Sequence, residues 1–190
     1  MTSKLRVNSI LPVDGAPTGG GGGIVQVVST NVDSTDTTTL TTQDTFYEIT
    51  PLTTTITTVS ANSKILVTAG IGGEASHEDY YLAFRCGRVV GGSLTYIFKG
   101  ADASNRVSAL SMGVPGYYDN DQASTTSYQT FPNMLDSPNQ AAGTAITYKF
   151  FVTSTAGNNA AYYLNRTVTD TDSNGYERLF SYLTLMEVSA

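Results

Sequence analysis

Lys64-Ile65-Leu66-Val67-Thr68-Ala69-Gly70 is the strongest strand signal in the chain. It is a short apolar run with β-branched residues that ends on a glycine, which is typical of a buried strand. Similar runs recur on both sides of it, at residues 24–28, 45–49, 52–59, 80–86, 94–98, 146–152, 161–165 and 179–188. No segment keeps a helical period over ten or more residues. The pattern predicts an all-β fold, an antiparallel β-sandwich or jelly roll.

Small hydroxyl side chains dominate the polar composition around these runs. The 190 residues include 29 Thr and 18 Ser, whereas charged residues make up 14% of the chain, against about 25% in an average protein. We expect the hydroxyls to occupy the outward positions of strands. A sheet face of that kind can pack against copies of itself with few buried ions to compensate, which favours an assembly subunit over an enzyme.

Charge and apolar patterning exclude several classes of function. Ten Lys and Arg face 16 Asp and Glu, for a net charge of -6, so the chain is not expected to bind nucleic acid. No apolar run approaches 18 residues, so no membrane insertion is expected. Residues 1–6 lack the apolar core of a secretory signal, and Cys86 has no second cysteine to pair with. Synthesis in a reducing cytoplasm is therefore predicted.

A run of five glycines, Gly19–Gly23, divides the chain into two parts. Residues 1–23 are predicted to form an extended N-terminal arm and linker, and residues 24–190 the sandwich domain. The arm carries apolar residues that we expect to pack on a partner: Leu5, Val7, Ile10, Leu11 and Val13. Within the domain, residues 31–42 are interpreted as a solvated connection, and residues 113–127 and 132–143 as long loops.

Catalytic arrangements are poorly represented, and no enzyme activity or cofactor is expected. His77 is the only histidine, and Cys86 lies within a predicted strand. The acidic pairs Asp119 with Asp121 and Asp170 with Asp172 could serve a glycan hydrolase, which stays open as a less favoured alternative. Each pair lies within one local turn, however, whereas glycosidase carboxylates usually come from separate strands.

One string, Asp170-Thr171-Asp172-Ser173-Asn174-Gly175, has oxygen ligands at alternate positions like the start of a calcium loop. Asp170, Asp172 and Asn174 are therefore candidate calcium ligands. The twelfth position is Ser181 and not the glutamate of an EF-hand. The competing interpretation, which we favour, is a strand-to-strand turn in which Asn174-Gly175 supplies positive φ angles, with no metal bound.

Tyrosines gather around the first long loop and form the candidate binding region. Tyrosine offers a large contact area at low entropic cost, and Asn and Asp bond well to sugar hydroxyls. The composition suits a carbohydrate-binding, adhesive loop and an intersubunit contact equally. Its members are Tyr117, Tyr118, Asp119, Asn120, Asp121 and Tyr128.

The N-terminal run from Ser3 to Thr18, followed by the glycines and by Ile24-Val25-Gln26-Val27-Val28, resembles the opening of tailed-phage virion proteins, cyanophage proteins among them. These proteins are usually described as tail-fibre or other structural proteins. The similarity continues in the runs at residues 63–67, 163–167 and 183–188.

This resemblance implies a homotrimeric, non-enzymatic protein on the virion surface, made in the host cytoplasm. Its arm would attach to other virion proteins of the capsid, tail or portal region, and its distal loops would contact the host envelope, with a surface glycan as a candidate ligand. The chain departs from a long fibre because it has no heptad repeats and no repetitive shaft. A capsid decoration or head-fibre protein that stabilises the capsid lattice is therefore the alternative.

Overall fold

The computed structural model describes residues 23–76, 82–113 and 126–189. The described residues form eleven strands and no helix, so none of them belongs to a helix able to cross a membrane. The strands are β1 (Ile24–Val32), β2 (Asp36–Leu40), β3 (Tyr47–Thr57), β4 (Lys64–Ala75), β5 (Leu82–Val90), β6 (Ser93–Ile97), β7 (Ser111–Gly113), β8 (Ser127–Asp136), β9 (Ala145–Ser154), β10 (Ala160–Leu164) and β11 (Ser181–Val188).

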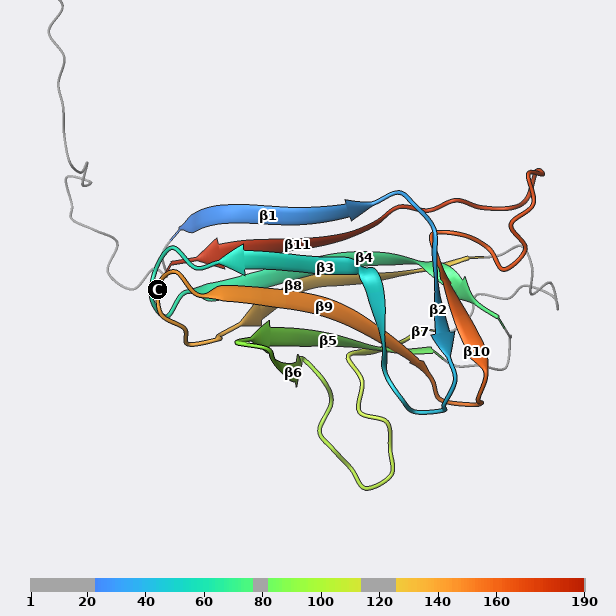
Figure 1. Cartoon of the computed structure of the whole chain (residues 1–190), viewed down its shortest axis with the longest axis horizontal. Coiled ribbons are helices and arrows are strands. Elements are labelled where there is room, and N and C mark those ends of the chain that lie inside the picture. The colour runs from blue at the N-terminus through green and yellow to red at the C-terminus, as the bar shows by residue number, and fades with distance from the viewer. Residues whose placement is uncertain (1–22, 77–81, 114–125, 190) are drawn as a thin grey trace, which may run out of the picture.

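Two antiparallel sheets pack face to face as a sandwich, which confirms the predicted fold class (Figure 1). Sheet A contains β1, β11, β4 and β8 in that spatial order, and β10 and β2 extend it beside the far half of β4. Sheet B contains β3, β9, β5 and β6, with β7 also beside β5. Apart from the β5–β6 hairpin, most neighbouring strands are far apart in sequence, and the chain passes repeatedly from one sheet to the other, as in a jelly roll.

The core lies between the sheets and is made by the inward residues of alternating strands. In β11, Ser181, Leu183, Leu185 and Glu187 are buried while the residues between them are partly exposed. β4, which the sequence marks most clearly, buries Ile65, Val67 and Ile71 completely. Period-two burial of this kind is what fixes the pairing register, because a slip of one residue would turn the apolar side outward.

Three strand assignments correct the sequence interpretation. Residues 31–42, expected as a connection, contain β2, whose inward residues are Thr38 and Leu40. The runs at 45–49 and 52–59 belong to a single strand, β3, interrupted by a bulge: four residues between Glu48 and Thr53 face only Phe150 on β9. The expected loop at 132–143 begins inside β8, which continues to Asp136 through a bulge at residues 132–133 opposite Thr68. Bulges interrupt the alternation that the sequence reading depends on.

One buried polar network joins the two sheets. Asp136 of β8 accepts hydrogen bonds from Arg88 of β5, at 2.7 and 2.8 Å, and from the Tyr148 hydroxyl of β9, at 2.7 Å. Tyr148 is fully buried and Asp136 nearly so. Burial and the neighbouring Asp136 charge raise the pKa of Tyr148, so its hydroxyl is a donor at neutral pH. The network fixes the distance between sheets at one end of the sandwich.

Candidate functional site

The two ends of the sandwich differ in what they carry. Ile24 pairs with Val188, and Val188 pairs with Lys64 at the start of β4. Ser127 pairs with Gly73, nine residues farther along β4, which corresponds to about 30 Å of strand. The chain therefore enters the domain at one end, and residues 113 and 126, which flank the predicted tyrosine loop, lie at the other (Figure 1).

Most of the predicted binding residues lie outside the described residues. These are the arm residues Leu5, Val7, Ile10, Leu11 and Val13, and the loop residues Tyr117, Tyr118, Asp119, Asn120 and Asp121, together with His77. Of the binding set, only Tyr128 is described, and it belongs to strand β8 rather than to a loop. The roles of the residues outside the described ranges remain predictions.

Tyr128 lies across the outer surface of sheet A. Its hydroxyl donates to the Phe180 carbonyl oxygen at 3.1 Å, and its ring passes over Gly70 and Gly72 of β4. A Cβ atom at either glycine would collide with the Tyr128 side chain, so these two glycines make room for the ring. With 42% of its surface exposed, Tyr128 remains available at the boundary between the sheet and the far end.

The outer face of sheet A carries an apolar row that runs straight across four strands. Val27 of β1 pairs with Met186 of β11, Met186 pairs with Leu66 of β4, and Leu66 pairs with Leu135 of β8. All four alternate with inward residues; Val27 and Leu135 are 56% and 48% exposed. Antiparallel sheets usually place polar residues on the face that contacts water, so this row is unusual for a face over which residues 23–76, 82–113 and 126–189 form no further layer.

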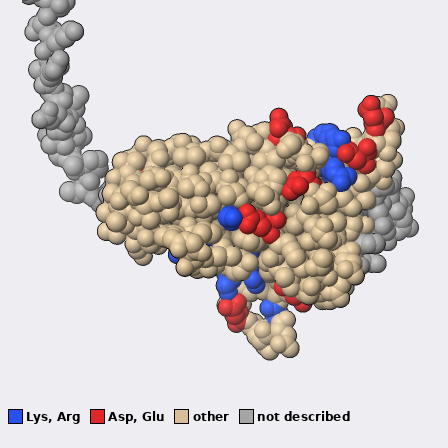
Figure 2. Space-filling model, in the orientation of Figure 1, with Lys and Arg blue, Asp and Glu red and all other residues tan. Residues whose placement is uncertain are grey.

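Hydroxyls and tyrosine rings, but hardly any charges, surround the apolar row. The next row consists of Ser29, Thr184 and Thr68, with a 2.8 Å bond between the first two hydroxyls. Of the charged residues in β1, β11, β4 and β8, only Lys64 is exposed, and Glu74 is buried at the far end where Val168 N–H donates to it at 2.6 Å. Beside β10 and β2, Arg166 stacks on Tyr163 at 4.2 Å from the ring centroid and donates to Thr37. Figure 2 shows the other side of the molecule, where β3 and β9 lie in front: charged atoms are seen toward the end with β2 and β10, in the middle and below, and few where β1 begins.

The segment with the candidate calcium ligands is a long connection from β10 to β11 rather than a tight turn. Asp170 forms an ion pair with Arg178. Gly175 has a positive φ of 96°, whereas Asn174 does not adopt a positive φ, so glycine alone supplies that geometry. Among the described residues, no group of three or more His, Cys, Asp or Glu is placed to hold a metal ion.

The β10–β11 connection also forms hydrogen bonds to Thr126, which directly precedes β8. Glu177 accepts hydrogen bonds from the backbone N–H of Thr126, at 2.8 Å, and from its hydroxyl. A cavity of about 210 Å³ lies within the connection, lined by residues that include Asp172, Ser173 and Tyr176. The β10–β11 connection and the start of β8 are therefore fastened together at the far end.

Cys86 is buried in β5 and is unsuited to nucleophilic chemistry. Burial, with the charge of Asp136 as a smaller cause, raises the pKa of its thiol to about 12. A thiol with that pKa is protonated at neutral pH, and only the thiolate is a good nucleophile. Cys86 instead belongs to the hydrophobic core.

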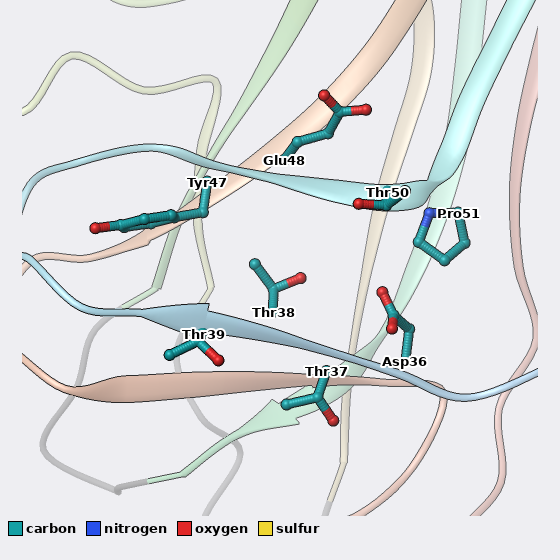
Figure 3. Close-up of a pocket in the computed structure, with 8 residues that line it drawn as sticks. All are labelled: Asp36, Thr37, Thr38, Thr39, Tyr47, Glu48, Thr50 and Pro51. Carbon is teal, nitrogen blue, oxygen red and sulfur yellow. The ribbon is translucent and has the colours of Figure 1, made fainter.

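An open groove of about 450 Å³, which the sequence did not indicate, lies between β2 and the start of β3 (Figure 3). We call it the β2–β3 groove. Its lining residues are Asp36, Thr37, Thr38, Thr39, Tyr47, Glu48, Thr50 and Pro51. The sequence does not indicate this groove, because the threonine-rich run of β2 is not typical of a strand and because a bulge in β3 places Thr50 and Pro51 on the rim.

Comparisons with known proteins add little to this description. No family model matches the chain, and no curated protein matches it in sequence. Similar solved structures include infectious bursal disease virus of the Gx strain (14% identity, TM-score 0.40, covering 98% of this chain and 43% of that chain) and of the Gt strain (13%, 0.41, 97% and 47%). The VP2 subviral particle of the same virus is a third (10%, 0.39, 97% and 44%).

This chain spans less than half the length of those chains. Likenesses at this level of identity and TM-score do not establish a shared function.

Proposed function

We propose that this protein is a non-enzymatic structural subunit of the virion surface, tail-fibre-like in plan, that assembles with copies of itself through the outer face of sheet A. The observation that carries the proposal is the apolar row Val27–Met186–Leu66–Leu135 on the outer side of β1, β11, β4 and β8, since Lys64 is the only exposed charged residue of these four strands. The resemblance of residues 3–28 to phage virion proteins supplies the setting.

The low charge of this side favours a second copy as its occupant. Each copy carries a net charge of -6, so two copies repel each other overall, and contact through a weakly charged surface keeps that repulsion smallest. Four strands at a spacing of about 4.8 Å, over about 30 Å of length, give an area of about 600 Å². Two such faces bury about 1,200 Å², the lower end of the range for stable specific interfaces. We expect three copies in the assembly, as the resemblance implies.

The two ends of the domain suit an attached and a distal role. The arm, residues 1–23, precedes the end where β1 begins, and the loop around Tyr117 to Asp121 is bounded by residues at the opposite end. In the proposal the arm joins other virion proteins and the distal end contacts the host envelope. A separation of about 30 Å along β4 lets both contacts form at once.

A capsid decoration protein is the second candidate, and the flat sheet A face favours it, because a wide uncharged surface also fits between neighbouring capsid subunits. The two candidates predict different positions on the particle. A decoration protein occupies the head in numbers proportional to the capsid lattice, and its loss lowers the resistance of the capsid to heat. A tail-fibre-like protein is found at the tail, and its loss lowers adsorption to cells.

Electron cryomicroscopy of intact particles, with and without this chain, tests the proposal. We expect density for the subunit on the outside of the particle. A particle assembled with a chain that lacks residues 1–23 should lose that density, while the truncated chain stays folded in solution. Full incorporation of the truncated chain would refute the role of the arm, and absence of the full chain from particles would refute the virion assignment.

A further inference from the structure

The β2–β3 groove contains polar groups that converge from two strands of different sheets. Figure 3 shows β3, with Tyr47 and Glu48, on one side and β2, with Asp36 to Thr39, on the other. Thr38, Thr50 and the Asp36 carboxylate direct oxygen atoms into the space between them. Thr38 is nearly buried, and β2 is held in place by five consecutive pairs with β10. The strands therefore present these oxygens on a rigid frame.

An aromatic ring forms one wall of the groove. The Tyr47 ring lies above β2 with one face toward Thr39 (Figure 3). Its hydroxyl shares a 2.6 Å hydrogen bond with Thr41 and accepts one from the Thr42 N–H at 3.1 Å. These bonds, the one with Thr41 first, hold the pKa of Tyr47 below its usual value. Because the hydroxyl is anchored outside the groove, the ring has a fixed orientation and offers its apolar face.

The two carboxylates at the groove have different roles. Glu48 is engaged by Lys149, whose ammonium lies 2.8 and 2.9 Å from its oxygens, and by Thr53 at 3.3 Å. Asp36 takes part in none of the ion pairs of the described residues. Its two oxygens can accept a pair of hydrogen bonds from neighbouring hydroxyls of one ligand, and charge-assisted bonds of this kind are the stronger ones.

We propose that the β2–β3 groove binds a neutral sugar unit. A pyranose presents vicinal hydroxyls, which match Asp36 with Thr38 and Thr50, and an apolar C–H face, which packs on the Tyr47 ring. An open polar groove suits one or two units of a longer chain that continues into solvent. Anionic sugars are disfavoured because the chain is acidic and Asp36 is an acceptor only.

The position of the groove agrees with the proposed function, on which this inference rests for its biological meaning. Tyr47 pairs with Val152, close to the Leu82–Ser154 and Leu82–Gly113 pairs at the far end of sheet B. The groove therefore lies toward the end assigned to the host and away from the start of β1. It adds a sugar contact on strands to the adhesive contact predicted for the tyrosine loop.

Titration of the full-length, isotope-labelled protein with single sugars, followed by NMR, tests the inference. The probes are D-glucose, D-galactose, D-mannose and N-acetyl-D-glucosamine, with N-acetylneuraminic acid as the anionic comparison. We expect at least one neutral sugar to shift the amide signals of residues 36–39 and 47–50, with weak affinity. The anionic sugar should leave those signals unchanged.

Three variants complete the test. Asp36→Asn should weaken binding at least about tenfold, because it removes a charge-assisted acceptor pair, and Thr50→Ala, at an exposed position, should weaken it less. Asp172→Asn in the β10–β11 connection is the matched control and should bind like wild type. The inference fails if no neutral sugar shifts these amides, or if Asp36→Asn binds as well as wild type. Because the titration needs no particle, such a failure would be separate from failure of the virion assignment.

Discussion

Both sheets consist of strands in which buried and exposed residues alternate, but their outer faces differ in how far other side chains cover them. On sheet B, Lys149 pairs with Glu48, and Arg85 stacks on Phe46 and Tyr96 at 3.9 and 4.9 Å from the ring centroids. Arg85 also donates to the Ser108 carbonyl oxygen at 2.6 Å, which holds the loop after β6 over the sheet. No described residue covers the apolar row of sheet A in this way.

This difference suits the proposed assembly, in which sheet B is covered by side chains and a loop of its own chain and sheet A by a second copy. Tyr96 packs edge-on against Phe151 at 5.3 Å, and Leu94 with Phe151 fills the space over Gly87. Phe151 is thus buried, although Leu94 keeps 44% of its surface exposed. On sheet A, Val27 and Leu135 lie at opposite ends of their row and remain about half exposed.

The largest expected effect comes from removing the buried polar network of Asp136, Arg88 and Tyr148, which joins the two sheets. Asp136→Ala removes the acceptor for Arg88 and Tyr148 and leaves a charge and a hydroxyl unpaired between the sheets. We expect a loss of about 3–5 kcal/mol in the free energy of unfolding, measured by urea denaturation. Asp170→Ala, which removes an exposed ion pair, is the control. Equal stability of Asp136→Ala and wild type would show that this network does not stabilise the fold.

The next effect tests the comparison directly. Val27→Lys with Leu135→Lys places charges at both ends of the apolar row, and we expect self-association to weaken at least about tenfold, or about 1.4 kcal/mol. Thr55→Lys with Thr147→Lys, on the outer face of sheet B, adds the same charge and should leave association unchanged. Sedimentation analysis measures both. If the sheet B variant dissociates and the sheet A variant does not, the two faces have been assigned the wrong way round.

A smaller effect is expected at Arg85, which holds the loop after β6 over sheet B. Arg85→Met keeps the alkyl stem but removes the stacked cation and its bond to Ser108. We expect a loss of about 1–2 kcal/mol in unfolding free energy and faster amide exchange in residues 100–110. Arg106→Met, at an exposed position in that loop, should show neither change.

The smallest effect concerns Glu187 of β11, close to the start of β1, and appears only at acidic pH. Glu187 is buried and accepts bonds from the N–H groups of Val59 and Ser60, at 2.9 and 3.0 Å, and from Gln26 at 2.5 Å. Burial acts to raise the pKa of Glu187, but these hydrogen bonds together outweigh burial and hold it below the usual value.

A lowered pKa in the folded state adds stability above the unfolded-state pKa, and that stability is lost as the pH falls through the folded-state value. Unfolding free energy should therefore decline below about pH 4.5. Denaturation of Glu187→Gln over the same pH range should show a shallower decline. An equally steep decline in the variant would assign the acid sensitivity to other groups.

The fold was accessible from the sequence where strands alternate cleanly, as in β4, β9 and β11. β2 was missed because Asp36-Thr-Thr-Thr-Leu40 has threonine at one of its buried positions, and β8 because Pro132 and Asn133 form its bulge. The β2–β3 groove could not be foreseen. Asp36 and Tyr47 meet only because β2 pairs with β10 in one sheet and β3 with β9 in the other, and single-sequence patterns carry no information about such pairings.

The position of β11 has a consequence for how the protein is made. β11 lies between β1 and β4 and pairs with both along its whole length. While the chain is being synthesised, β1 therefore has no partner until residues 181–188 have left the ribosome, and the long-range pairing makes folding slow. A chain cut short before β11 lacks the strand that joins β1 to the rest of sheet A. Such a chain cannot present the whole apolar row, so in the proposed assembly truncated subunits would lack the face through which copies associate.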